Sequence, residues 1–583
     1  MSKSGAPTPS GPHTVAWQAL GLFLAATVLI SFRLHAFGLP LENDECNYAY
    51  IGKRILEGDR LYVDVWDHQP PGVFVLYAAV IKLFGDSPHV FRWMTAGVAL
   101  SCLLLIFLIV RRVAGEFPAI FAALLYAVVS SDPGTAGEGC NREIYLNALV
   151  LLGWYGTMRG VASRRYGWIA LAGAALGAAS TIKTIVAVPW LALAGWIGWT
   201  LWRDALPHAL KLVWYSVLAF ALPPLLIWAS VFAYFGATGR WPVFLEAVFL
   251  FNLSYSGGGE PFLDRFFHFF APPGHRGVFD SALPLWVAGA VSTLWLLVVA
   301  VYRRDRHAAL LVLLALSAFA AVCLPGRFWP HYYHLLIPPL VIATASACRV
   351  RGRGPARSGG MSFRDGRGTD QRVSESRATT AGESTTLEQA IVSSESRLML
   401  WLRIAVMGGV MVLTLAEEYR HYLCQPPFGI TVHRYNSRDF WGKAQGENVR
   451  RVTDPTDAIF VFSNDAEIYY YAQRRCASRF TMITGLQAAY AGAEGRRRIL
   501  LTELRANPPR LILLLFDEPP FDEWRSFLAE NYGEPVGVDY HDRTGAPIMF
   551  VLARKDAPLP PLDWNWDRSE VGGWFPGERP PRR

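Results

Sequence analysis

Charged residues are scarce in this chain of 583 residues, and they are unevenly spread. Asp, Glu, Lys and Arg make up 17% of it, against about 25% in typical soluble domains. They are sparse over the first 350 residues and dense after that, while hydrophobic residues make up 52% of the whole. This distribution excludes an ordinary soluble globule. It favours a polytopic membrane protein with an appended water-exposed domain.

Cysteine pairs and phosphate-binding glycine loops are also missing. The seven cysteines form no CxxC pair and have no His-rich partner, which argues against a zinc site. No nucleotide-binding glycine loop occurs, so no nucleotide cofactor is predicted. Four cysteines lie outside the apolar segments, and a disulfide among them is possible: Cys46, Cys140, Cys424 and Cys476.

Eleven apolar segments approach the length of about 20 residues that a spanning helix needs. The first has no cleavage site followed by a mature domain, so we expect a retained anchor. The apolar run from Pro70 to Phe84 would reach only about 22 Å as a helix, and we predict that it lies at the membrane surface. Spans are predicted at 15–33, 90–110, 117–132, 144–159, 167–182, 184–201, 211–235, 283–302, 308–325, 331–348 and 398–416.

The net charge of +8 follows this membrane topology. With the N-terminus in the cytoplasm, every basic cluster between spans falls on the cytoplasmic side, as the positive-inside rule requires. We therefore expect no nucleic-acid partner. The opposite loops carry acids, His, Asn and aromatic residues, so any chemistry should face the periplasm or the exterior of a plasma (inner) membrane. The cytoplasmic basic residues are Arg111, Arg112, Arg159, Arg164, Arg165, Arg203, Lys211, Arg303, Arg304 and Arg306.

The predicted fold is a polytopic α-helical membrane protein with a small C-terminal α/β domain. Strands expected at 457–463, 510–516 and 547–553 alternate with helices at 466–475 and 521–531. Asp465, Glu467 and Arg474 are expected to be surface residues of the first of these helices. The predicted parts are a transmembrane domain at 1–348 with its first outer loop at 34–89, a disordered basic loop at 349–397, the last span at 398–416, the extracytoplasmic α/β domain at 417–556 and a Pro-rich tail at 557–583.

A dense set of acidic, basic and aromatic residues fills the first outer loop. From Glu42 to Gly72 it reads ENDECNYAYIGKRILEGDRLYVDVWDHQPPG. An isolated Asp44-Glu45 pair would be taken as solvated acids. A carboxylate near the membrane surface can instead act as general base on an acceptor hydroxyl, and the surrounding residues favour this interpretation.

The order DE…Y.A…G..LY.D.WD..PPG…LFG…..R, which ends at Arg92, resembles the first extracytoplasmic loop of GT-C glycosyltransferases. It is most similar to the branch of protein mannosyltransferases, lipid A aminoarabinose transferases and related bacterial lipopolysaccharide glycosyltransferases. A looser similarity extends to about residue 348. The resemblance implies an inverting membrane transferase that takes a sugar from a polyprenyl phosphate, without a nucleotide, and passes it to a lipid, glycan or protein acceptor.

The resemblance also assigns roles within the loop. The catalytic base or organiser falls on Asp44, with Glu45 beside it. Lys53 matches a basic position and is expected to contact the donor phosphate, while Tyr48 is expected to contact substrate. The aminoarabinose branch usually has a lysine just before the Pro-Pro, where this chain has Gln69, and this departure weakens the case for that particular donor.

Two charged residues at the outer ends of later spans are further candidates. Glu143 opens the fourth span and either contacts substrate or is an acid favoured by the helix dipole. Lys183 interrupts a 33-residue apolar stretch, which is costly unless it meets water or an anion. We expect Lys183 to contact the donor phosphate; snorkelling to the surface is the alternative.

The segment before the tenth span resembles an HYY…P motif of the same branch. We expect Arg327 and His331 to contact the donor phosphate, because such a site needs basic donors. An aromatic belt is the alternative explanation for its tyrosines. A divalent cation with His331 as a ligand is possible but not favoured, and no cofactor is predicted. The full set of expected substrate-binding residues is Tyr48, Tyr62, Glu143 and Tyr332.

The Phe-rich outer loop from Trp241 to Arg276 is predicted to lie in the membrane interface. A transporter or lipid flippase is the main alternative function. It should place ionisable groups in the middle of several spans, whereas here they gather at one face. A non-catalytic scaffold would leave the dense motif of the first loop unexplained.

Overall fold

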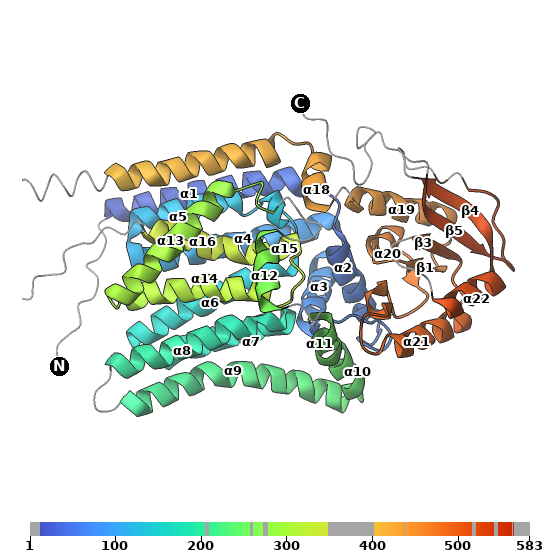
Figure 1. Ribbon diagram of the computed structural model, residues 1–583, viewed down its shortest axis with the longest axis horizontal. Helices are drawn as coiled ribbons and strands as arrows, with labels where there is room; N and C mark the ends of the chain where they lie inside the picture. Colours follow the sequence, from blue (N-terminus) through green and yellow to red (C-terminus); the bar gives the residue numbers. More distant parts are fainter. Residues whose placement is uncertain are drawn as a thin grey trace, which may run out of the picture.

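The computed structural model describes residues 12–204, 209–256, 261–271, 278–347, 401–435, 438–515, 521–540, 546–562 and 564. Long helices run along the longest axis of the molecule, and a sheet domain lies at one end of them (Figure 1). The predicted fold class is confirmed. The loop predicted at 349–397 and most of the predicted tail lie outside the described residues.

The chain is a multi-pass membrane protein. Within the described ranges, six helical stretches are long and apolar enough to cross a bilayer. They contain α1 (Pro12–His35), α4 (Pro88–Ala114), α8 (Ala187–Asp204), α9 (Ala209–Ala237), α13 (Leu283–Tyr302) and α14 (Arg306–Cys323). The bundle also holds α5 (Glu116–Val129), α6 (Arg142–Ser163), α7 (Tyr166–Ile182) and a helical segment at 401–418.

The tenth predicted span is interrupted. It divides into α15 (Pro330–Tyr333), a 3-10 turn η5 (His334–Leu336) and α16 (Ile337–Ala347). Pro338 and Pro339 occupy the first turn of α16, where a helix needs no backbone donor. His331 and Tyr332 are therefore carried by a short separate helix at the end of the bundle nearest the sheet domain (Figure 1).

The first outer loop folds into α2 (Asn43–Leu56) and α3 (Pro71–Phe84). A capping box starts α2. The Glu42 side chain accepts the backbone N–H of Glu45, and the Glu45 side chain accepts the backbone N–H of Glu42. Pro71 starts α3 at a position that tolerates the missing N–H. Figure 1 shows both helices between the long helices and the sheet domain.

Gly72 of the Pro-Pro-Gly sequence lets α3 lie directly against the end of α7. A Cβ atom at Gly72 would be 2.4 Å from Thr181 Oγ1 and 2.6 Å from the Thr181 carbonyl oxygen. Any side chain there would push the two helices apart. Thr181 is two residues before Lys183, so this glycine sets the position of that lysine.

The predicted Phe-rich outer loop is helical where the structure describes it. It contains α10 (Trp241–Leu245), a π-helical turn η4 (Glu246–Leu250), α11 (Phe251–Ser256) and α12 (Phe262–Phe270). Residues 257–260 and 272–277 lie outside the described ranges.

The C-terminal domain contains a five-stranded mixed sheet with the order β2-β1-β3-β5-β4. The strands are β1 (Ala458–Phe462), β2 (Arg475–Cys476), β3 (Leu511–Leu515), β4 (Tyr532–Tyr540) and β5 (Pro547–Arg554). β1 pairs in parallel with β2 and β3, and β5 pairs antiparallel with β3 and β4. β4 was not expected, because its sequence YGEPVGVDY has no regular alternation; its proline is tolerated on an edge strand. The helices of this region are α18 (Pro427–Tyr435), α19 (Arg438–Val452), α20 (Glu467–Ala472), α21 (Ala493–Ala506) and α22 (Asp522–Asn531).

One expectation about this domain was wrong. Asp465, Glu467 and Arg474 are buried instead of lying on the surface, because the end of β1 turns toward α2 and Arg438 pairs with the Asp465 carboxylate. The possible disulfide is absent among the described cysteines: Cys46, Cys140, Cys424 and Cys476 are all free thiols.

Candidate active site

Asp44 lies where α2, α6 and α15 meet. Its Oδ2 atom is 3.9 Å from Arg142 Nη2 and 4.0 Å from His331 Nε2. The Asp44 side chain is 30% exposed, whereas those of Arg142 and His331 are 2% and 6% exposed. The carboxylate is therefore reachable from solution while its neighbours are buried behind it.

A buried ion pair continues this cluster. Lys183 Nζ donates to Glu143 Oε1 at 2.7 Å and lies 3.4 Å from the centroid of the Tyr332 ring. Burial lowers the pKa of Lys183 to about 8, although Glu143 acts in the opposite direction. Burial would raise the pKa of Glu143, but the charges of Lys183, His331 and Arg142 together outweigh it and lower that pKa to about 2. Both groups are charged at neutral pH.

Arg142 is the main site residue absent from the predicted set. Its Nε and Nη1 atoms are buried without a hydrogen-bond partner, and its guanidinium lies 5.4 Å from the Tyr48 ring centroid. The buried Tyr48 hydroxyl also has no partner. Such unsatisfied donors are costly and suit an anionic ligand. An arginine on the outer side, against the positive-inside bias, was the signal available in the sequence.

Asp67 and His68 border the same cluster. Burial raises the pKa of Asp67 to about 6, even though Asn47 Nδ2 and the Gln69 N–H donate to its carboxylate at 2.7 and 2.8 Å. Burial lowers the pKa of His68 to about 3, and the charges of Arg142, Arg327 and Lys183 lower it further. The His68 ring is neutral at pH 7 in a strongly positive surrounding.

Glu45 is fully buried and is occupied by other contacts. The Cys140 N–H donates to Glu45 Oε1 at 2.5 Å, the Glu42 N–H donates to Oε2 at 3.2 Å, and Arg92 Nη1 lies 3.6 Å from Oε2. These contacts fasten the start of α2 to the segment before α6. Glu45 thus holds the helix that carries Asp44.

Lys53 is not brought to the cluster. It follows Asp44 by nine residues on α2, which places it about 13 Å farther along the helix axis, and it pairs with Asp86 at 2.8 Å. Tyr62 is buried, and its hydroxyl donates to the Gln69 carbonyl at 2.7 Å. That bond fixes the chain just before the Pro-Pro-Gly sequence.

Arg327 lies at the edge of the cluster, where the C-terminal domain arrives. Its Nη2 atom donates to the Tyr255 carbonyl at 2.7 Å and to the Tyr490 hydroxyl at 2.9 Å. The guanidinium is 4.3 Å from the Tyr255 ring centroid. Burial lowers the pKa of His68, and the charge of Arg327 adds to this effect. Burial raises the pKa of Tyr255, and the charge of Arg327 acts in the opposite direction.

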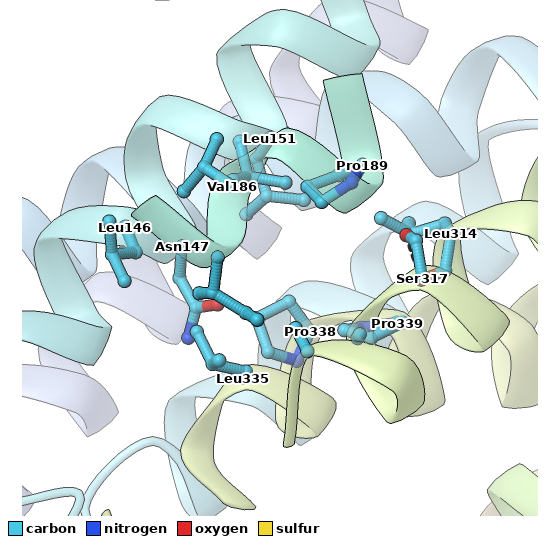
Figure 2. Close-up of a pocket in the computed structure, with 14 residues that line it drawn as sticks. Leu146, Asn147, Leu151, Val186, Pro189, Leu314, Ser317, Leu335, Pro338 and Pro339 are labelled. Atoms are coloured by element: carbon cyan, nitrogen blue, oxygen red, sulfur yellow. Dashed lines mark hydrogen bonds between the residues drawn. The ribbon is translucent and has the colours of Figure 1, made fainter. Parts of the chain in front are cut away.

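An apolar pocket of about 30 Å³ is formed by residues that follow the cluster in the chain, and Figure 2 shows its lining. Its walls follow the charged residues along the chain: Asn147 comes one turn after Glu143, Val186 shortly after Lys183, and Leu335 shortly after His331. The pocket is lined by Leu146, Asn147, Val150, Leu151, Ile185, Val186, Pro189, Leu314, Ser317, Ala318, Ala321, Leu335, Pro338 and Pro339. A charged site and an apolar pocket therefore adjoin one another.

Comparison with known proteins identifies the fold. Residues 68–228 match the family model described as dolichyl-phosphate-mannose-protein mannosyltransferase. The apo structure of ArnT from Cupriavidus metallidurans is similar with a TM-score of 0.52 and 16% identity, over 93% of this chain and 98% of that one. The chain has a GT-C glycosyltransferase fold. The resemblance detected in the first outer loop is thereby confirmed.

Two further solved structures are similar to the chain. The structure of the same ArnT bound to undecaprenyl phosphate has a TM-score of 0.51 and 16% identity, over 92% of this chain and 98% of that one. An oligosaccharyltransferase from Archaeoglobus fulgidus has a TM-score of 0.49 and 12% identity, over 86% of this chain and 70% of that one. No curated protein matches the sequence.

Proposed function

We propose that this protein transfers a sugar from a polyprenyl-phosphate donor to a hydroxyl of a lipid, glycan or protein acceptor, at the extracytoplasmic face of the inner membrane. The observation that carries the proposal is the partly exposed carboxylate of Asp44 beside the buried guanidinium of Arg142. A general base and an anion-binding group are the two functions that such a transfer requires.

The reaction is an inverting displacement with Asp44 as the base. Asp44 takes the proton of the acceptor hydroxyl, and the acceptor oxygen forms a bond to the anomeric carbon. The bond from that carbon to the phosphate oxygen breaks, and the polyprenyl phosphate leaves with one more negative charge. The His331 Nε2 atom faces this carboxylate from α15, 4.0 Å from Asp44 Oδ2.

The leaving phosphate is stabilised by Arg142 and Lys183. The buried Nε and Nη1 atoms of Arg142 have no hydrogen-bond partner. Their N–H groups can donate to an oxygen of the phosphate. Lys183, which pairs with Glu143, adds a second positive charge next to the leaving phosphate. Charge-assisted bonds of this kind are about twice as strong as neutral ones.

The apolar pocket beside the cluster supports a lipid donor. It begins within one turn of Glu143, Lys183 and His331, so an isoprene unit next to the phosphate would meet an apolar wall. ArnT, which shares the fold, has been crystallised with undecaprenyl phosphate.

The test is transfer from labelled polyprenyl-phosphate sugars in membranes that hold equal amounts of wild type or Asp44→Asn. We expect a loss of about 10²–10⁴-fold, the usual contribution of a general base, with donor binding retained. Asp64→Asn is a matched control, because Asp64 is an exposed acid of the same loop that pairs with Arg60. Equal transfer by wild type and Asp44→Asn would remove Asp44 from catalysis. Movement of lipid across the membrane without transfer would support the transporter or flippase alternative.

A further inference from the structure

A second pocket, which is polar, lies at the end of the helix bundle opposite the candidate active site. Its volume is about 490 Å³, and it is lined by Trp199, Thr200, Arg203, Arg304, Asp305, Arg306 and His307. It lies between the end of α8 and the connection from α13 to α14. α8 has 18 residues and starts just after Lys183, so its ends are about 27 Å apart. That distance is close to the thickness of a bilayer core.

The pocket carries an excess of positive charge. Three arginines and one aspartate line it, and the aspartate is engaged in capping α14. Asp305 Oδ1 accepts the His307 N–H at 2.8 Å and the Ala308 N–H at 3.1 Å. The Arg203 guanidinium makes one long bond, of 3.5 Å to the Arg304 carbonyl, and lies 5.1 Å from the Trp199 ring centroid. Most of its five N–H donors therefore face the pocket or solvent.

Thr200 gives an independent sign of a ligand. Its side chain is 2% exposed, lines the pocket, and its hydroxyl is buried without a hydrogen-bond partner. A buried hydroxyl without a partner is costly. A ligand oxygen in the pocket would satisfy it.

Residues that adjoin the lining arginines in the chain carry exposed apolar or aromatic side chains. Trp202 is 63% exposed, Val301 64% and Tyr302 84%, and these residues are neighbours in sequence of Arg203 and Arg304. Exposed Trp and Tyr next to basic residues are typical of the water interface of a membrane.

We propose that this pocket binds the phosphate of an anionic phospholipid in the leaflet opposite the candidate active site. Basic pockets between spanning helices bind acidic lipid head groups in this way. In the topology proposed above, this is the cytoplasmic leaflet. The inference goes beyond sugar transfer, since the pocket shares no residue with the Asp44 cluster. A bound lipid would tie α8 to α14, whose opposite ends lead to Lys183 and His331.

The test uses the purified full-length chain in a zwitterionic detergent and follows thermal unfolding during titration with short-chain phosphatidylglycerol. We expect the lipid to raise the Tm of wild type, with an apparent affinity roughly thirtyfold lower in Arg203→Gln/Arg304→Gln. Arg164→Gln/Arg165→Gln is the matched control. This pair lies on the same predicted membrane side, and Arg164 and Arg304 both have a positive φ, of 53° and 51°. The control should bind as wild type does.

Several results would overturn the proposal. Equal stabilisation by glycerol phosphate would mean that the pocket takes a free anion, and equal stabilisation by phosphatidylcholine would mean that head-group charge is irrelevant. Equal weakening in the control would point to general surface charge. If the double variant does not fold, Thr200→Val replaces it, with an expected loss of about fivefold from the missing hydroxyl. An unchanged affinity in Thr200→Val would then reject the pocket.

Discussion

Asp44 and Glu45 are adjacent in the chain and have the same chemistry, yet the fold gives them different surroundings. Asp44 is partly exposed and faces Arg142 and His331. Glu45 is fully buried and accepts backbone N–H groups from Glu42 and Cys140. A carboxylate with its oxygens already occupied cannot readily take a proton from a substrate. The two predicted catalytic acids therefore differ in role, with Asp44 proposed as the base and Glu45 as the residue that positions it.

Arg142 provides the first test at the residue scale. Arg142→Gln should lower kcat/KM for transfer by about 10²–10³-fold, because a preorganised donor to the leaving phosphate is lost. Arg142→Lys should recover part of this loss, since one positive charge returns without the planar fork. The measurement is transfer with a labelled polyprenyl-phosphate sugar. Arg60→Gln, which removes an exposed arginine paired with Asp64, should leave transfer unchanged, and an equal loss in both variants would contradict the role of Arg142.

Lys183 leads to a prediction about pH. Burial lowers its pKa to about 8, so its ammonium charge is present below that pH and is lost above it. Donor affinity should therefore fall as the pH rises through 8 in wild type, and it should stay flat in Lys183→Arg. The free energy of unfolding should change in the opposite sense. The pKa of Lys183 is lower in the folded state than the ordinary value of 10.5, so the unfolded state holds more protons between pH 8 and 10.5, and this group makes the fold more stable as the pH rises through that range.

The measurement for Lys183 is binding of a polyprenyl phosphate between pH 6.5 and 9.5, together with the Tm at each pH. A fall in affinity that follows a fall in Tm would show loss of structure instead of loss of one charge. An identical fall in Lys183→Arg would assign the titration to another group.

At the scale of elements, the contact between α3 and α7 shows why the Pro-Pro-Gly sequence matters. Tyr62 fixes the chain before it through the Gln69 carbonyl, Pro71 starts α3, and Gly72 lets α3 touch the Thr181 backbone. α7 ends at Ile182, and Lys183 follows. The loop motif thus acts partly by placing a lysine that is more than 100 residues away in the chain.

Gly72→Ala should accordingly disturb the site without touching it. The new methyl group would lie 2.4 Å from Thr181 Oγ1 and 2.6 Å from the Thr181 carbonyl oxygen, so α3 and α7 must separate. We expect a loss of about 1–3 kcal/mol in stability, as for overpacked cores, and a loss of transfer greater than the stability loss explains. Gly97→Ala is the control, since a Cβ there meets nothing within 4 Å. Thermal unfolding and transfer measured on both variants would decide, and equal behaviour of the two would be contrary to the prediction.

At the scale of the whole molecule, the C-terminal domain is part of the wall of the site. Arg496 of α21 pairs with Glu246, and its guanidinium lies 5.5 Å from the Trp66 ring and 5.0 Å from the Phe251 ring. Phe251 in turn packs on His68, with ring centroids 5.2 Å apart. The sheet domain thus holds α11 against the first outer loop at the border of the charged cluster.

Breaking this contact should uncouple the domain from the site. Arg496→Ala should lower transfer and make the chain between the two parts more sensitive to protease, because Glu246 and two aromatic rings lose their partner. A double-mutant cycle with Glu246→Gln should give a coupling of about 1 kcal/mol, within the range for contacting residues. Arg498→Ala is the control, since Arg498 is an exposed residue of the same helix that pairs with Glu494. Additive effects of the two substitutions would show that the pair carries no coupling.

Much of the architecture follows from the sequence alone. Long apolar runs predict spanning helices because the bilayer has no other way to satisfy their backbone, and the pattern of β1, β3 and β5 predicts strands because alternation with helices is local. The motif of the first loop predicts the fold and Asp44, since its spacing lies within one stretch of chain. β4 was not predicted from the sequence, because its Gly and Pro residues interrupt any periodic pattern.

Only the tertiary structure decided which candidates meet. It brought Asp44, Glu143, Lys183, His331 and Tyr332 together from α2, α6, the end of α7 and α15, and it added Arg142. In the structure Lys53 pairs with Asp86, and the buried Glu45 side chain accepts the Cys140 N–H instead of facing the site. The reason is physical: hydropathy and capping act between near neighbours in the chain, whereas a charged site in a membrane protein depends on which helix ends pack side by side, and non-local contacts alone determine that.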